Sequence, residues 1–373
     1  MQRRQSRRKS RKQSRKPVRR QSRKYIKASR VLDLSERGDF NRLPPDVYFI
    51  FQQYANQKRP RGDPLFTSIR ERAEFNNQSL RKAIKLWAKN REKCERRYGY
   101  MKDWNVTKVT DMSQLFAAAA DVEDFYENFN EPLNDWDVSN VKTMEAMFEN
   151  VRSFNQPLNN WGVSNVENMN YMFMNASSFN QPLSNWNVSS VKTMSSMFEN
   201  ATSFNQPLYN WDVSKVKTMY NMFKNAISFN QSLNNWNVSS VEYMGGMFDG
   251  AASFNQPLDR WDVSSVKTME AMFYNATSFN QPLNNWDVSK VKTMEAMFFG
   301  ATLFNQPLNN WNVSGVETME AMFNGATSFN QPLNNWNVSG VEDMDNMFDG
   351  ATSFNQEQTI RMWNEQIGED VFP

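Results

Sequence analysis

The cations of residues 1–30 are the side chains in this sequence best suited to binding a ligand. The segment holds 15 of the 43 Lys and Arg residues and contains no Asp or Glu. Such a cationic run neutralises phosphate groups without reading base sequence. We therefore expect residues 1–30 to bind nucleic acid or another polyanion through Arg3, Arg4, Arg7, Arg8, Lys9, Arg11, Lys12, Arg15, Lys16, Arg19, Arg20, Arg23 and Lys24.

The same segment is almost free of apolar residues, and its like charges repel one another. Both properties predict a disordered basic arm, because little apolar surface is available to offset the ordering entropy. A nuclear-import signal and a solubilising tail are alternatives for this arm. The remaining residues carry 28 basic and 40 acidic side chains, so the arm is attached to an acidic body.

Catalytic chemistry finds little support in the composition. The chain has no His and one Cys, which excludes Ser-His-Asp and Cys-His sites and His-ligated metals. Met residues such as Met169 could suggest thioether ligands, but Met at helical spacing is typical of a packed core. The sequence therefore predicts a protein that is not an enzyme and has no cofactor and no metal.

A strict repeat of 25 residues organises most of the chain. Eight equal steps, with no insertion or deletion, connect Trp136, Trp161, Trp186, Trp211, Trp236, Trp261, Trp286, Trp311 and Trp336. In repeats of this length each turn buries its apolar face against the previous turn. We expect these Trp side chains to be structural and to form a stacked row in the core.

One repeat can be divided into a strand and a helix. Leu158, Trp161 and Val163 have the spacing of a short buried strand, and Ser164 follows as the preferred N-cap of a helix. In four repeats a Glu follows three residues later, as Glu167 follows Ser164, which predicts a capping box.

The predicted helix carries one apolar stripe, formed by Val166, Met169, Met172 and Phe173. It should end two residues after the Phe, where only Asn or Gly occurs, because both residues tolerate the left-handed conformation. The fold class predicted is an α/β repeat. It would be a leucine-rich-repeat-like, right-handed solenoid with short parallel strands and one short helix per 25-residue turn.

A second column of the repeat is always Asn, from Asn130 to Asn355 in steps of 25. We expect an internal Asn ladder that satisfies backbone groups at a bend, since buried polar groups need partners. Exposed residues beside the predicted strand, such as Asn159, Asn160 and Gly162, are nearly all polar and alike. The exceptions are Tyr209, Asp259 and Arg260. A recognition surface usually carries several aromatic and Arg anchors, so this uniform face is interpreted as solvated polar residues.

The motif W-[DN]-V-S-x-V-x-x-M-x-x-M-F-x-x-A-x-S-F-N-Q-P-L resembles the BspA-type leucine-rich repeat, catalogued as a mycoplasma repeat of unknown function. The resemblance covers about residues 104–356. It implies a leucine-rich-repeat solenoid and, in bacteria, surface adhesion. The Arg/Lys/Ser-rich arm resembles the tails of proteins from giant DNA viruses, which suggests a giant-virus or protist member of the family.

The domain organisation expected has four parts. A basic arm spans residues 1–30, and a helical region that caps the solenoid spans residues 31–103. About ten repeats fill residues 104–356, and a C-terminal cap spans residues 357–373. The segment Leu43–Tyr54 resembles the opening of an F-box, while a helix that packs on the array is the alternative.

We expect a scaffold that binds a protein through the solenoid and a polyanion through the arm, with a virion as one setting for it. The alternatives are an F-box-like adaptor that recruits substrates and an adhesin-like surface protein. No membrane span and no apolar signal-peptide core is found in the sequence. The location expected is therefore intracellular or virion-associated.

Overall fold

A computed structural model of the protein describes residues 73–368. The basic arm, the segment Leu43–Tyr54 and residues 369–373 lie outside the described residues.

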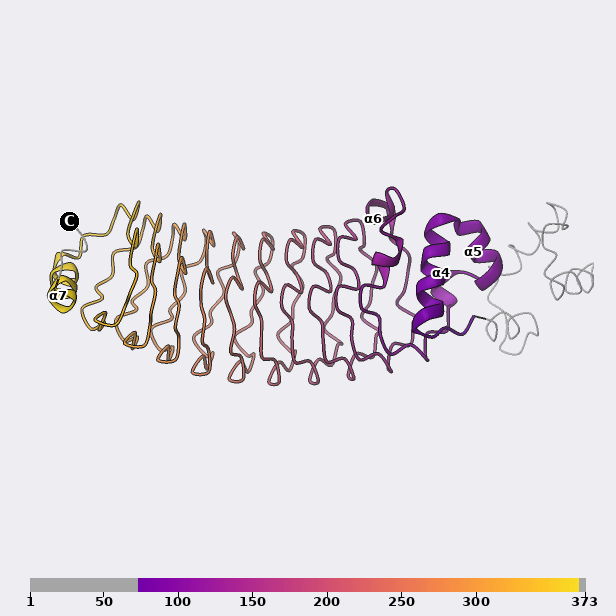
Figure 1. Ribbon diagram of the computed structural model, residues 1–373, viewed down its shortest axis with the longest axis horizontal. Coiled ribbons are helices and arrows are strands. Elements are labelled where there is room, and N and C mark those ends of the chain that lie inside the picture. Colours follow the sequence, from indigo (N-terminus) through magenta and orange to yellow (C-terminus); the bar gives the residue numbers. More distant parts are fainter. Residues whose placement is uncertain (1–72, 369–373) are drawn as a thin grey trace, which may run out of the picture. The chain divides into compact units, whose positions relative to one another are not determined.

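From Trp136 onward, each repeat of 25 residues forms one coil that lies beside the next (Figure 1). Isolated parallel bridges join equivalent residues of neighbouring coils, from Thr143–Asn168 to Thr318–Asp343. Four backbone N–H groups of a coil donate to carbonyl oxygens of the following coil at 2.8–3.1 Å, as for Met169, Tyr171, Phe173 and Asn175. The coils are thus joined by backbone hydrogen bonds at a fixed register.

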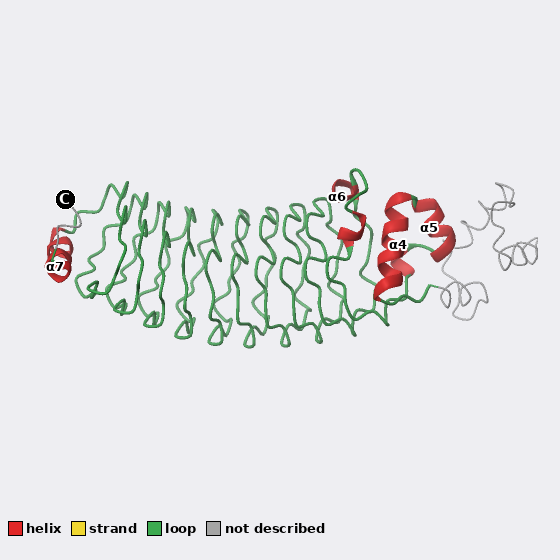
Figure 2. Cartoon of the chain, in the orientation of Figure 1, coloured by secondary structure: helices red, strands yellow, loops and turns green. Residues whose placement is uncertain are grey.

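The helix predicted in each repeat is wrong. Within the described coils of residues 136–356 the chain forms turns, and the helices lie outside this range (Figure 2). Alternate N–H groups, such as those of Tyr171 and Phe173, donate to the next coil, and those between them donate to residue i−3, as Met172 does to Met169. The i−4 bonds of an α-helix are therefore not formed. Tyr171 and Asn175 also have positive φ angles of 59° and 60°, which interrupt any right-handed helix.

Two related predictions need the same correction. The backbone N–H of Ser189 donates to the Oδ1 atom of Asn187 at 3.1 Å, so this Ser follows an Asx turn and is not a helix N-cap. The predicted strand at Leu158–Val163 contains a turn, in which the Trp161 N–H donates to the Leu158 carbonyl at 3.1 Å. The bridges lie further along the repeat, at Asn168 and its equivalents.

The nine Trp side chains of the repeat are each at most 4% exposed. Neighbouring indoles from Trp161 to Trp236, and from Trp261 to Trp336, lie within 4° of parallel with centroids 6.2–6.4 Å apart. From Trp161 to Trp336, each Nε1–H donates to the carbonyl of a Leu in the preceding coil, as Trp236 does to Leu208 at 2.9 Å. The Trp136 Nε1–H donates to the Met101 carbonyl at 2.8 Å. Burial of the large ring therefore leaves no unpaired donor in these coils.

The predicted Asn ladder is confirmed. The Oδ1 atom of each Asn accepts the backbone N–H of the equivalent Asn in the next coil at 2.9–3.2 Å, from Asn130 to Asn355. In most coils the same oxygen also accepts from a Gln side chain, as Asn230 does from Gln256 at 3.0 Å. Each Asn thus fixes the bend of the following coil.

The N-terminal end of the coil array is covered by helices. Helix α4 (Asn77–Lys89) begins at the N-cap Asn76, which forms a capping box with Ser79. Its buried Trp87 packs edge-on against Phe129 of the first coils. The other elements at this end are α5 (Arg91–Tyr98), η2 (Met101–Asp103), η3 (Phe116–Ala119) and α6 (Phe125–Asn128).

The last coil is covered by helix α7 (Glu357–Ile367). Its Trp363 ring stacks on Trp336 at a centroid distance of 6.0 Å and continues the indole row. Thr359 accepts the Leu333 N–H and Gln366 accepts the Val338 N–H, at 3.2 and 2.8 Å. These bonds satisfy two backbone donors of the last coil.

Candidate functional site

Three rows of variable side chains run across the coils, on either side of the bridged backbone. The bridge row contains Thr143, Asn168, Thr193, Thr218, Tyr243, Thr268, Thr293, Thr318 and Asp343. The second row, two residues later, contains Glu145, Asn170, Ser195, Tyr220, Gly245, Glu270, Glu295, Glu320 and Asp345. The third row, four residues further, contains Glu149, Met174, Glu199, Lys224, Asp249, Tyr274, Phe299, Asn324 and Asp349. We call these three rows the ladder face.

The variation within these rows carries information. The inward columns keep one residue type, such as Met at Met169 and Phe at Phe173, whereas the second row contains Glu, Asn, Ser, Tyr, Gly and Asp. Apart from the buried Gly245, its side chains are half-buried or exposed. Packing therefore does not dictate their identity, and they are available for binding.

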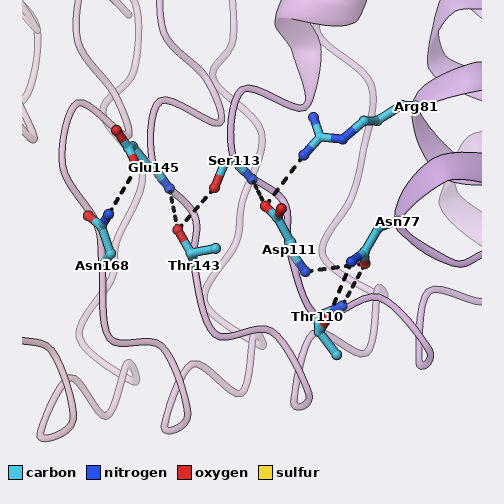
Figure 3. A network of polar contacts seen from close by, with 8 residues as sticks. All are labelled: Asn77, Arg81, Thr110, Asp111, Ser113, Thr143, Glu145 and Asn168. Atoms are coloured by element: carbon cyan, nitrogen blue, oxygen red, sulfur yellow. Dashed lines mark hydrogen bonds and ion pairs between the residues drawn. The ribbon is translucent and has the colours of Figure 1, made fainter.

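At the N-terminal end, the ladder face is a network of polar contacts that reaches helix α4 (Figure 3). Asn77 accepts the Thr110 N–H at 2.9 Å, and Arg81 pairs with Asp111 at 3.4 Å. Further along, the Ser113 and Thr143 hydroxyls lie 3.0 Å apart, and Asn168 donates to Glu145 at 3.0 Å. These polar side chains satisfy one another across the coils.

In the middle of the face, the Tyr220 ring lies over Gly245. A Cβ added to Gly245 would stand 3.0 Å from the ring and 2.9 Å from the Cγ atom of Glu270. The Tyr220 side chain thus spans Gly245 towards Glu270, which lies two coils away. Burial raises the pKa of the Tyr220 phenol, and the charge of Glu270 raises it further.

The absence of a side chain at Gly245 also leaves one hydroxyl unpaired. Elsewhere a bridge-row Thr can bond the second row of the preceding coil, as Thr218 does with Ser195 at 2.9 Å. At Thr268 that neighbour is Gly245. The buried Thr268 hydroxyl has no hydrogen-bond partner within the described part of the chain.

A second exposed aromatic residue lies in the bridge row beside this one. Tyr243 is 43% exposed and Tyr220 is 41% exposed. The Nζ atom of Lys267 lies 5.7 Å from the centroid of the Tyr243 ring, close enough for a cation–π contact. In the third row Lys224 pairs with Asp249 at 2.6 Å, and this hydrogen bond raises the pKa of the Lys224 ammonium.

Carboxylates dominate the charge of the ladder face. From residue 136 to residue 350, its cationic side chain is Lys224, and its carboxylates are Glu145, Glu149, Glu199, Asp249, Glu270, Glu295, Glu320, Asp343, Asp345 and Asp349. The ion pairs of residues 73–368 include neither Glu295 nor Glu320 nor Asp345. The C-terminal half of the face therefore presents uncompensated negative charge.

A neighbouring row, one residue before the bridge row, behaves differently. Its Lys and Glu residues pair between coils, as in Glu167–Lys192 at 2.6 Å and Lys292–Glu317 at 2.9 Å. Lys267 pairs with Glu242 at 2.6 Å, which lowers the pKa of the Glu242 carboxyl. We call this set the charge row, and its internal pairs neutralise much of its charge.

None of the site residues predicted from the sequence belongs to the ladder face. The polyanion-binding residues Arg3–Lys24 lie outside the described residues, and the Trp residues of the repeat are buried. The ladder face was missed because the strand was assigned to Leu158–Val163. The sequence feature that could have indicated the ladder face is the variability of a few repeat positions within an otherwise strict repeat.

Residues 73–368 contain no group of three or more Cys, Asp or Glu side chains arranged to hold a metal ion. Among these same residues, no helix has the length and apolar character needed to cross a membrane.

Comparison with known proteins gives one similarity. The model of the family described as "Mycoplasma protein of unknown function, DUF285" matches residues 88–210, 121–233, 203–302 and 282–371. These overlapping matches cover the coil array and α7. No curated protein and no solved structure matches the chain.

Proposed function

Because the chain belongs to the DUF285 family of tandem repeats, we propose that its coil array is a non-enzymatic scaffold for protein–protein interaction. The fold proposed for the array is a leucine-rich-repeat-like, right-handed solenoid of the BspA type, and the protein would act inside a cell or within a virion. The observation that supports binding is the pair of exposed side chains Tyr220 and Tyr243, set in the variable rows of the ladder face.

Exposed aromatic residues are frequent anchors of protein interfaces, because they supply large contact areas at low entropic cost. Nothing in the packing of the coils requires an aromatic side chain at either residue, since Glu, Ser or Thr occupies most of the equivalent positions. The two Tyr residues lie in adjacent coils and would contact the same partner.

Affinity capture from the native source tests this proposal. The full chain should retain a specific partner that the double variant Tyr220→Ala/Tyr243→Ala loses. The matched control is Tyr209→Ala/Ile227→Ala, which removes two exposed apolar side chains outside the ladder face and should retain the partner. Equal capture by all three proteins would contradict the assignment of the binding surface.

We also propose that the basic arm binds nucleic acid or another polyanion. The support is its charge, with 15 cations and no carboxylate in residues 1–30. Binding should weaken steeply as salt increases, because bound counterions are released from the polyanion. Filter binding with duplex DNA and with RNA tests this: deletion of residues 1–30 should abolish the salt-sensitive binding, and unchanged binding would refute the role of the arm.

A further inference from the structure

We propose that the partner of the ladder face is an extended basic peptide segment, with Arg or Lys at every third residue. This inference rests on the proposed function and names the chemical class of its partner. It places the cations of the peptide over alternate carboxylates of the row Glu270, Glu295, Glu320 and Asp345, and its first residues against Tyr220 and Tyr243.

Charge is the first argument. Four successive coils present a carboxylate in the second row, at Glu270, Glu295, Glu320 and Asp345. The last three have no ion-pair partner in residues 73–368. Lys292, three residues before Glu295, pairs within the charge row with Glu317 at 2.9 Å, and the charge-row residues before Glu320 and Asp345 are Glu317 and Glu342. The second row therefore remains available to an external cation.

The spacing of the carboxylates is the second argument. Neighbouring parallel chains lie about 4.8 Å apart, so equivalent carboxylates two coils apart are separated by roughly 10 Å. A polyproline II segment advances about 9.3 Å for every three residues. Cations at every third residue of such a peptide would therefore meet alternate carboxylates of the row, such as Glu270 and Glu320.

The aromatic residues supply the third argument. Tyr243 already accepts a cation against its ring from Lys267, at 5.7 Å. Tyr220 lies in the adjacent coil, and its ring faces Gly245, where no side chain separates it from the next coil. An Arg side chain stacks favourably on such rings, which makes Arg a better fit than a neutral residue.

The same charge argues against a polyanion at this face. A nucleic acid or an anionic membrane would meet unpaired carboxylates at close range, where like charges repel. Binding of either at the ladder face is one of the outcomes that would overturn the inference.

The experiment measures the fluorescence anisotropy of labelled peptides of about 18 residues as the full chain is added. This length gives several turns of polyproline II helix, so that several cations can contact the row at once. The first peptide has Arg at every third residue with Ser and Pro between, the second has Glu in place of Arg, and the third has the same composition with Arg clustered at one end. We expect the first to bind most tightly and the second not to bind. Labelled single-stranded DNA provides the polyanion comparison.

Two double variants with the same change in charge locate the site. Glu295→Gln/Glu320→Gln removes carboxylates of the second row, and Glu317→Gln/Glu342→Gln removes carboxylates of the charge row in neighbouring coils. Glu295→Gln/Glu320→Gln should weaken binding of the spaced Arg peptide about fivefold or more, because each exposed ion pair contributes a modest free energy. Glu317→Gln/Glu342→Gln should weaken its binding less. Circular dichroism and thermal unfolding confirm that both variants fold.

Failure of this inference is distinguishable from failure of the proposed function. If Tyr220→Ala/Tyr243→Ala loses the captured partner while Glu295→Gln/Glu320→Gln retains it and the Arg peptide does not bind, the face binds a protein that is not basic. Equal weakening by both Glu double variants, or binding of the clustered peptide as tightly as the spaced one, would also overturn the inference.

Discussion

The Oδ1 atom of Asn275 stands 2.1 Å from the point that a Cβ on Gly300 would occupy. Both residues have positive φ, at 51° and 64°. In the earlier coils this column contains Asn in succession, and each side chain donates to the previous one, as Asn200 does to Asn175 at 2.7 Å. Where Gly follows Asn, the Asn side chain fills the space over the glycine. The column is therefore packed in two different ways.

Gly300→Ala should destabilise the protein more than Gly325→Ala. Both substitutions place a side chain at positive φ, which costs about 1 kcal/mol. At Gly325 the nearest atom to the new Cβ is the Gly300 Cα at 3.6 Å, whereas at Gly300 the Asn275 side chain must move. We expect a total of about 2–3 kcal/mol for Gly300→Ala from urea unfolding, because overpacking adds to the backbone strain.

Gly300→Asn provides the rescue. An Asn at residue 300 can donate to Asn275 as Asn200 donates to Asn175, and Asn tolerates the left-handed conformation. The Gly300→Asn variant should therefore lose less unfolding free energy, relative to the parent, than the Gly300→Ala variant. Equal losses of unfolding free energy for Gly300→Ala and Gly300→Asn would show that backbone strain alone explains the cost of a side chain at residue 300.

Asn230→Ala should cost about 1–3 kcal/mol, because two partly buried donors lose their acceptor. The Asn230 Oδ1 atom accepts the Asn255 N–H and the Gln256 side chain, both at 3.0 Å. Faster hydrogen exchange at the Asn255 amide would locate the damage. The control is Asn235→Ala, an exposed residue five positions later, which should change stability by less than about 0.5 kcal/mol.

The indole hydrogen bond can be tested by two Trp-to-Phe substitutions. Trp236 donates from Nε1 to the Leu208 carbonyl at 2.9 Å, whereas the buried Nε1 of Trp87 has no partner within residues 73–368. Both changes remove a similar ring volume, so Trp236→Phe should cost about 1 kcal/mol more than Trp87→Phe. Chemical unfolding of both variants measures the difference, and an equal cost would mean that the bond contributes nothing net.

Cys94 should be unreactive in the folded protein and should make it less stable at alkaline pH. Burial, followed by the charge of Glu95, raises the pKa of the Cys94 thiol from 9.0 to about 12. The thiol remains protonated when folded but ionises when unfolded. Its contribution to stability is therefore present below pH 9 and is lost as the pH rises from 9.0 towards about 12.

Two measurements check this. A thiol reagent at about pH 8 should label the native chain slowly and the unfolded chain fully, because the thiolate is the reactive form. Cys94→Ala should show a shallower loss of stability between pH 9 and 11 than the parent, since the thiol whose pKa rises on folding is removed. Rapid labelling of the native chain would contradict the burial of Cys94.

The packing of the repeat could be predicted from residue types, but its backbone path could not. The left-handed backbone at Asn175 and Gly300 was predictable because Asn and Gly share little else. Val166, Met169 and Met172 were assigned to the apolar stripe of a helix and are buried, although they lie in turns. Successive turns and a helix can bury the same spacing of residues, so periodicity alone does not distinguish them.

A second left-handed column carries no sequence signature. It contains Ala146, Tyr171, Ser196, Asn221 and Gly246, whose φ angles lie between 53° and 60°. Ala and Tyr do not favour this conformation, and the inter-coil hydrogen bonds hold them in it. With this column unrecognised, the segment was assigned to a helix, and the ladder face next to it was overlooked.

The Asn ladder makes the coils interchangeable units. Every coil offers the same acceptor to its successor and receives the same donor, so gain or loss of a whole 25-residue copy leaves each joint intact. A shift of one residue would instead displace every Asn from its donor in the coils that follow. The length of the array can thus change only by whole 25-residue repeats. Each added repeat would bring one new side chain to each row of the ladder face.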